Sequence, residues 1–491
     1  MTRTGGPGRL QGLATGIKNT TYLRRWLILG SLIGVVAGLG AILFTEALDA
    51  ANHLLLGTLG GYHTPLPIGE GNVASSAHMP RPWAIPIVVG AGGLISGILV
   101  HRLAPEAAGH GTDAAIDAVH HNPMGIRPRV SVVKIISSAI TIGSGGSGGR
   151  EGPTAQISSS FASFLARRLD LTPADARIAL TVGMGAGIGA IFRAPLGGAV
   201  LGAEILYRED VESEALIPSL LASIVGFAVF GAVEGFVPIF GYLQGYRFNH
   251  PIELVYYALI GLAAGLLGML YSDVFYRVHH FAGRSRLSGA LKPAIGGLLV
   301  GVVALVLPQV LGTGYGWVQE AMTDQLLGIP LWIVLLLPLA KILSTALSIG
   351  SGGSGGIFGP GMVIGGFLGA AVWRLLHGFA PGLPISPAPL VIVGMISCFG
   401  SIAHAPIAVM LMVAEMTGSL ELLAPAMAAV GIATLVVGDH TIYASQLKNR
   451  ADSPFHRLRF GLPMLDAIPV SESMTPPKLA LKSGESVAAA Q

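Results

Sequence analysis

Glu151 is the residue whose type and position most clearly suggest chemistry. It follows residues 143–149, which read Gly-Ser-Gly-Gly-Ser-Gly-Gly, and it precedes Gly152-Pro153. Glycines let backbone N–H groups approach a ligand closely, and a helix that begins after them turns unpaired N–H groups and a positive dipole end toward it. Such neutral donors suit an anion. The stretch therefore predicts an anion site, with one ionisable side chain beside it.

The same stretch occurs a second time in the chain. Residues 350–356 repeat residues 143–149, and Gly359-Pro360 repeats Gly152-Pro153, at a shift of 350 − 143 = 207. Residues 341–346 match residues 134–139 at that shift, and a later block that pairs Glu204 with Glu415 matches at 415 − 204 = 211. Ile357-Phe358 replaces Arg150-Glu151, so the second copy carries no ionisable group there. Such a duplication in an apolar chain predicts two equivalent halves of a transporter with a site between them.

Three other interpretations of the glycine stretch are weaker. Residues 143–148 fit G-x-G-x-x-G, but a dinucleotide site needs a soluble β-α-β unit and an acidic residue about twenty positions later, and neither is present. A phosphate-binding P-loop needs Gly-Lys-Ser/Thr, which these loops lack. A membrane-embedded serine hydrolase would pair Ser147 with His404 or His110, which leaves the second serine loop without a purpose. We therefore expect no catalytic residues, enzyme activity, metal or cofactor.

The composition is that of a polytopic membrane protein. Of 491 residues, 52% are hydrophobic and only 11% are charged, and the mean hydropathy is +0.67. Some uncharged runs, such as residues 26–45 and 254–272, are long enough to cross a bilayer, whereas others are short or broken by glycine and proline. The 70 glycines and 31 prolines favour many short, tilted helices packed closely together. We predict an all-α fold surrounded by membrane lipid.

The charge distribution bears on orientation and partners. The first 25 residues contain five basic residues and no acidic one, which predicts a cytoplasmic N-terminus. The first apolar run begins at Trp26 and is long enough to span, so a cleaved signal is not expected. The single cysteine, Cys398, excludes intramolecular disulfides. No Lys/Arg cluster is interleaved with aromatic residues, so nucleic acid is not expected as a partner.

Three parts are expected along the chain. Residues 1–25 form a cytoplasmic segment. Residues 26–450 form the transmembrane part, with a first half at about 21–209, connecting spans from Ser213, and a second half at about 254–448. A duplicated unit with an odd number of crossings predicts inverted halves. Residues 451–491 form a cytoplasmic tail in which 468–475 look like the beginning of a CBS domain, too short to build a core.

These motifs resemble those of the CLC family of chloride channels and chloride/proton exchangers, over roughly residues 21–450. Residues 149–153, Gly-Arg-Glu-Gly-Pro, match the family signature G-K/R-E-G-P, and residues 356–360, Gly-Ile-Phe-Gly-Pro, match G-x-F-x-P. Residues 441–444, Thr-Ile-Tyr-Ala, look like the helix start that carries the pore tyrosine. The resemblance implies an inverted repeat of helices and a homodimer with one anion pathway per subunit.

The resemblance also implies roles for individual residues. Glu151 would be the external gating glutamate, and Arg150 would anchor its loop or add positive potential. The backbone N–H groups of Ile357 and Phe358 and the hydroxyl of Tyr443 would coordinate a central anion. The anion-binding positions implied in this way are His110, Gly111, Thr112, Arg150, Gly152, Gly356, Ile357, Phe358 and Tyr443.

Two departures from the family pattern affect these expectations. The signature G-S-G-I-P appears as residues 109–113, Gly-His-Gly-Thr-Asp, so His110 stands where a serine hydroxyl usually coordinates the anion. Its imidazole can donate an N–H instead or serve only in packing, and we expect Asp113 to cap the helix that begins there. In family exchangers a proton-relaying glutamate follows the position of Glu204, but here that residue is Ile205.

The expected function is chloride transport across a prokaryotic plasma membrane, with both termini in the cytoplasm. The aliphatic Ile205 favours a channel-like or loosely proton-coupled mode. One alternative is chloride/proton antiport by a route that does not use a glutamate at position 205. Another is membership of a fluoride-selective branch, whose members also vary the first motif.

Overall fold

The computed structural model describes residues 21–76, 79–243, 248 and 250–456. Within these ranges the chain forms helices and three isolated β-bridges but no β-strand, which confirms the all-α fold. Seven of the described helical segments are long and apolar enough to cross a membrane, and four further apolar helices are shorter. The N-terminal residues 1–20 and most of the tail, including the expected start of a CBS domain, lie outside the described residues.

The helices fall into two series along the chain. The first series is α2 (Tyr22–Ala51), α3 (Ala84–Leu103), α4 (Thr112–His121), α5 (Arg129–Gly143), α6 (Glu151–Arg168), α7 (Pro173–Ile191), α8 (Pro195–Glu204) and α9 (Ser213–Glu234). The second series is α10 (Glu253–Arg284), α11 (Leu291–Ala304), α12 (Tyr315–Ala321), α13 (Leu331–Thr345), α14 (Phe358–Leu376), α15 (Ala388–Ile402), α16 (Pro406–Thr417) and α17 (Leu423–Val437).

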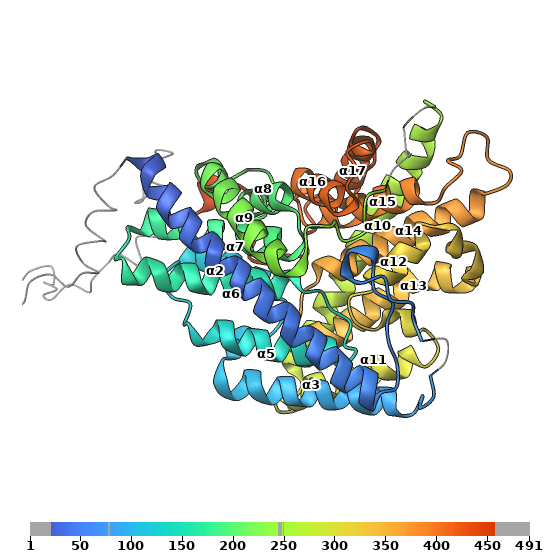
Figure 1. Cartoon of the computed structure of the whole chain (residues 1–491), viewed down its shortest axis with the longest axis horizontal. Helices are drawn as coiled ribbons and strands as arrows, with labels where there is room; N and C mark the ends of the chain where they lie inside the picture. The colour runs from blue at the N-terminus through green and yellow to red at the C-terminus, as the bar shows by residue number, and fades with distance from the viewer. Residues whose placement is uncertain (1–20, 77–78, 244–247, 249, 457–491) are drawn as a thin grey trace, which may run out of the picture.

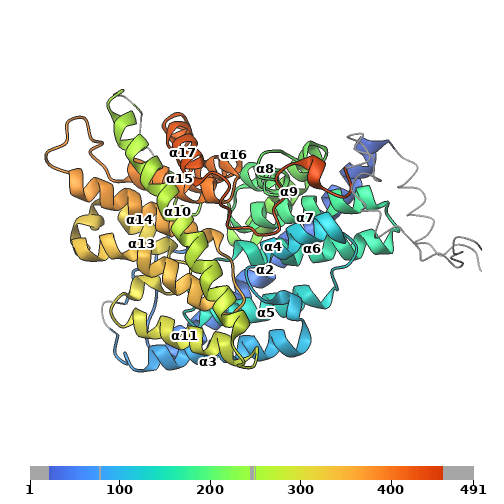
Figure 2. The same cartoon turned by 180° about the vertical axis from the view of Figure 1, so that it is seen from behind.

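The two series repeat one arrangement in inverted form. α9 packs on α2 and α7, and in the same way α17 packs on α10 and α15. Figure 1 shows α2 crossing one face of the molecule diagonally, and Figure 2 shows α10 doing so on the opposite face. Two pairs of counterparts, α3 with α11 and α8 with α16, pack directly against each other. Because α9 has its counterpart in α17, we propose that the first unit extends to Glu234 rather than ending near Glu209.

Glycine makes the closest helix contacts possible. A side chain at Gly365 of α14 would collide with the carbonyl oxygen of Gly394 on α15, and one at Gly394 would collide with that of Gly365. Backbone-to-backbone packing of this kind substitutes for the hydrophobic effect, which does not drive helices together inside lipid. It holds α14, one of the helices that position the site, rigidly against α15.

One glutamate from each half accepts backbone N–H groups from the other half. The carboxylate of Glu204, at the end of α8, accepts the N–H groups of Ile407 and Ala408 at the start of α16 at 3.3 and 2.7 Å. The carboxylate of Glu415 on α16 accepts the N–H groups of Leu196 and Gly197 at the start of α8 at 3.1 and 2.7 Å. Each half therefore caps a helix of the other.

Candidate functional site

The two glycine-serine loops bring the starts of α6 and α14 together. The N–H of Gly149 donates to the carbonyl of Gly356 at 2.7 Å, and the N–H of Gly356 donates back to Gly149 at 2.6 Å. Arg150 and Ile357 are the N-cap residues of α6 and α14, and neither makes a side-chain capping bond. The first turns of both helices therefore lie together in one buried region, and their N–H groups have no side-chain cap.

Glu151 lies at this meeting point. Only 1% of its surface is exposed, and its Oε1 accepts a hydrogen bond from the hydroxyl of Tyr315 at 2.5 Å. A Cβ at Gly356 or at Gly359 would approach its carboxylate oxygens to 2.6 Å, so these glycines leave the space that the carboxylate fills. The backbone N–H of Gly359, in the first turn of α14, faces the same carboxylate. The carboxylate of α6 therefore fills a buried space against the first turn of α14.

Residues 109–113, which correspond to the family signature G-S-G-I-P, pack against the start of α6. A Cβ on Gly111 would come within 2.7 Å of the carbonyl oxygen of Gly152, and a Cβ on Gly152 would meet the Thr112 hydroxyl at 3.1 Å. Gly111 has φ +85°, in the left-handed region, which makes glycine the suitable residue there. The motif therefore approaches α6 as closely as backbone allows.

His110, Thr112 and Tyr443 come together, as the family resemblance implies. The rings of His110 and Tyr443 are 5.6 Å apart between centroids, and Thr112 is near enough to Tyr443 to affect its electrostatics. Both His110 and Tyr443 are buried, and the His110 ring also contacts Phe275 at 5.9 Å. The imidazole is thus positioned beside the hydroxyl that is expected to bind the anion.

The start of α14 is held from two sides. Tyr271 of α10 donates its hydroxyl to the carbonyl of Ile357 at 2.9 Å. The ring of Phe358 packs on Phe399 at 4.2 Å and on Phe192 at 5.2 Å. These contacts fix the first turn of α14 and surround its N–H groups with apolar rings.

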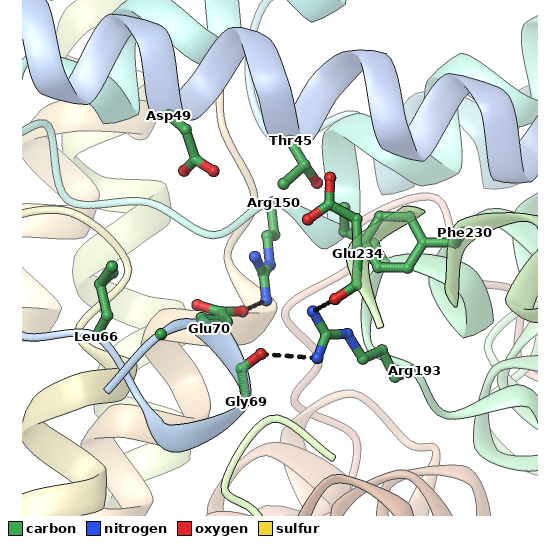
Figure 3. A pocket seen from close by; sticks show the side chains of 11 residues that line it. Thr45, Asp49, Leu66, Gly69, Glu70, Arg150, Arg193, Phe230 and Glu234 are labelled. Atoms are coloured by element: carbon green, nitrogen blue, oxygen red, sulfur yellow. Dashed lines mark hydrogen bonds and ion pairs between the residues drawn. The ribbon is translucent and has the colours of Figure 1, made fainter. Parts of the chain in front are cut away.

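Arg150 lines a cavity of about 220 Å³. Its guanidinium forms a buried ion pair with Glu70, which lies on the short 3₁₀ turn Ile68–Glu70 between α2 and α3. Figure 3 shows Arg150 and Arg193 both pointing toward this turn, where Arg193 donates to the carbonyl of Gly69 at 2.7 Å. Arg150 therefore anchors its loop to an ionic cluster that the sequence does not reveal, because Glu70 is 80 positions away from Arg150.

The expectation for Asp113 was wrong. The N-cap residue of α4 is Gly111, which has no side chain to cap the helix, and the N–H of Asp113 in the first turn donates to Nδ1 of His110 at 3.5 Å. The carboxylate of Asp113 instead accepts the N–H of Ser445 at 2.8 Å and its hydroxyl at 3.0 Å. The Asp113 carboxylate therefore binds a residue 332 positions away, two residues after Tyr443, and does not cap its own helix.

The other residues that the sequence singled out are apolar or already hydrogen-bonded. Ile205 is fully buried, and its carbonyl accepts a hydrogen bond from the Gln446 side chain at 3.0 Å. Glu204 is used in capping α16, as described above. Ser147 bonds to the Thr345 hydroxyl at 2.9 Å, and His404 bonds to the carbonyl of His440 at 2.8 Å. The structure thus does not join Ser147 and His404 as the hydrolase interpretation requires.

The sequence analysis missed Tyr315, the hydrogen-bond donor to Glu151. A signal for it exists in a third repeated block, since Gly312-Thr313-Gly314-Tyr315 follows Gly109-His110-Gly111-Thr112 at a shift of 312 − 109 = 203. A buried lysine closes each of these loops: Lys134 donates to the carbonyls of Ala107 and Gly109, and Lys341 donates to those of Val310 and Gly312. The two four-residue segments share only two glycines, so this repeat is too short to be recognised from the sequence alone.

Fold and site together define an integral membrane protein of two inverted helical halves, with a buried carboxylate where the starts of α6 and α14 meet. A sequence profile of the voltage gated chloride channel family matches residues 92–438. A chloride channel protein described as ClcB-like, from Ralstonia nicotianae, is 31% identical over 443 residues, which are 87% of this chain and 98% of that protein. The voltage-gated ClC-type chloride channel ClcB of Salmonella typhimurium is 29% identical over 403 residues, covering 81% and 92% of the two chains. The chain belongs to the CLC family.

Solved structures share this fold. The crystal structure of a slow cyanobacterial Cl⁻/H⁺ antiporter matches with a TM-score of 0.73 and 23% identity, over 85% of this chain and 96% of that one. A CLC-type fluoride/proton antiporter matches with a TM-score of 0.72 and 23% identity, over 88% and 100%. At this level of identity the likeness concerns the fold.

Proposed function

We propose that the protein moves chloride across a membrane along a path between the starts of α6 and α14, and that Glu151 gates this path. The observation that carries the proposal is the buried Glu151 carboxylate, which lies against the first turn of α14 where an anion would be bound. Neutral backbone donors hold an anion without the full charges that would prevent its release. Protonation of Glu151 removes the competing charge and frees the position for chloride.

The proposed mode is channel-like or loosely coupled to protons. Proton movement through the cytoplasmic half needs a titratable group or a continuous chain of water, and the buried Ile205 supplies no such group. Glu204 precedes it, but its carboxylate already accepts two backbone N–H groups of α16. The alternative is antiport by another internal route, and the fluoride/proton antiporter among the structural matches keeps fluoride as a second candidate anion.

The test uses liposomes that contain only this protein and records chloride efflux and proton movement together. We expect chloride flux with little proton counter-transport when a chloride gradient is imposed. Protons driven uphill by that gradient would contradict the channel-like mode and establish exchange. Absence of any anion flux would contradict the proposal that the protein transports anions.

Variants of Glu151 test the gate in the same assay. Glu151→Gln should make chloride flux nearly independent of external pH, because an amide carries no charge to lose. Glu151→Ala should leave room for a further anion and raise chloride binding measured by calorimetry. A wild-type pH profile in both variants would remove Glu151 from the gating role.

A further inference from the structure

Tyr315 is placed to control the position of Glu151. Its hydroxyl donates to Oε1 of Glu151 at 2.5 Å, and both side chains are buried. Gly359 makes the contact possible, because a Cβ there would come within 2.5 Å of the Tyr315 hydroxyl and 2.6 Å of the carboxylate. Hydrogen bonds from a hydroxyl to an ionised carboxylate are shorter and stronger than those between neutral groups.

The repeat explains why a donor stands at this position. Gly314 has φ +88° and Gly111 has φ +85°, and each directly precedes the first residue of a short helix. That first residue is Tyr315 in α12 and Thr112 in α4. Thr112 interacts with Tyr443, whereas Tyr315 interacts with the gate. The second half thus carries its own version of the first signature motif, with a longer hydroxyl side chain that reaches Glu151.

The Tyr315 ring has little freedom to move. It contacts Phe240 at 6.0 Å and Phe192 at 6.4 Å, and the guanidinium of Arg150 lies 5.7 Å from its centroid. Arg150 is fixed in turn by its ion pair with Glu70. A hydroxyl held in this way is a fixed donor, so its hydrogen bond favours one position of the gating carboxylate.

Other titratable groups face Glu151 from the surrounding elements. They are Arg150 at the start of the same helix with its partner Glu70, Tyr271 on α10, Tyr315 on α12, and Tyr443 after α17. The hydroxyl of Tyr271 is used by the Ile357 carbonyl, and the side chain of Tyr443 interacts with Thr112. Among the described residues, Tyr315 is therefore the tyrosine whose hydroxyl donates to the gate.

We propose that Tyr315 is a positioning residue that holds ionised Glu151 in the blocking position and so sets the external pH at which the pathway opens. This inference rests on the proposed gating role of Glu151. While the carboxylate is charged, the Tyr315 O–H stabilises it at the start of α14. Once protonated, the carboxyl group gains much less from this donor, and it leaves the position more readily.

The test compares Tyr315→Phe with the wild type in protein-only liposomes, with chloride efflux measured against external pH. The variant keeps the ring and removes the donor, so the flux profile should move to higher pH by about one unit, a tenfold change in proton concentration. Calorimetry should show tighter chloride binding, because the competing carboxylate is held less firmly. Tyr257→Phe is the matched control, since it removes a buried hydroxyl that bonds to Glu253 at 3.1 Å on α10, and it should leave the profile unchanged.

A double variant separates the two levels of the proposal. In a Glu151→Gln background, Tyr315→Phe should produce no further shift of the profile. If Glu151→Gln itself keeps the wild-type pH profile, the gating role fails, and the role of Tyr315 fails with it. If Glu151→Gln flattens the profile but Tyr315→Phe changes neither the midpoint nor chloride binding, only the assignment of Tyr315 is overturned.

Discussion

His110 is the residue in which the proposed anion-binding motif departs most clearly from the family pattern. Its imidazole lies 5.6 Å from the Tyr443 ring and presents a larger, more polarisable donor than a serine hydroxyl. His110→Ser should keep transport active but change the order of chloride, nitrate and fluoride fluxes, because the size and direction of one donor change. Calorimetric chloride binding gives an independent readout. If both the ranking and the affinity match the wild type, His110 serves only in packing.

Glu212 is a second residue with a marked electrostatic setting, in the connection between α8 and α9. Its carboxylate accepts hydrogen bonds from Tyr207 at 2.9 Å and from His456 at 3.0 Å, and it forms ion pairs with Arg177 and Arg450. Burial alone would raise its pKa, but His456 and Arg177 outweigh burial and lower the pKa to about 2. Because this value lies below the ordinary one, ionised Glu212 stabilises the fold above about pH 5, and that stability is lost as the pH falls toward 2.

Glu212→Gln should therefore lower the free energy of unfolding at pH 7 by roughly 3 kcal/mol, since buried Arg177 loses its nearer charged partner and retains the Glu214 carboxylate at 3.9 Å. Thermal unfolding in detergent measures this, and the difference from the wild type should narrow as the pH is lowered from 5 to 3. Glu209→Gln is the control, because its pair with Lys448 is exposed at the surface and should be worth less than about 1 kcal/mol. Equal effects of the two variants would contradict the importance of the buried cluster.

At the scale of elements, the reciprocal capping of α8 and α16 gives a matched pair of variants. Glu204→Gln and Glu415→Gln each remove a negative charge from the start of a helix in the other half, so each should cost about 1 kcal/mol of stability. Because the two glutamates have equivalent contacts, we expect the same small effect on chloride flux and on proton movement. Loss of uphill proton movement in Glu204→Gln alone would instead identify Glu204 as a proton relay.

Much of this element arrangement follows from the sequence. The shifts of 207 and 211 predict the paired halves, and the glycine loops predict helices that begin at or near Glu151 and Phe358, as they do. Contacts that join distant segments through single side chains leave no periodic trace, so the bonds of Glu151 to Tyr315 and of Arg150 to Glu70 could not be predicted. The Asp113 cap failed for the same physical reason, since a partner distant in sequence competes successfully with a local one.

At the scale of the whole molecule, we expect two copies of this chain to associate. The expectation rests on the family resemblance, and the exposed apolar side chains on several helices, among them α2, α9 and α10, are consistent with burial by lipid or by a second copy. Light scattering of the detergent-solubilised protein, corrected for bound detergent, should give twice the chain mass of 50.4 kDa. A mass of one chain at micromolar concentration would contradict the homodimer.

The reciprocal helix caps also bear on how the protein is made. Glu204 is translated 407 − 204 = 203 residues before its partner Ile407. The sequence separation between Gly109 and its partners Gly353 and Gly355 is larger still. During translation the first half therefore enters the bilayer with a carboxylate and a glycine loop whose partners do not yet exist. Insertion factors that shield polar groups should bind it in that interval, and the conducting path should appear only after α16 has been delivered. Two separately expressed halves should restore flux only when both are present in the same membrane.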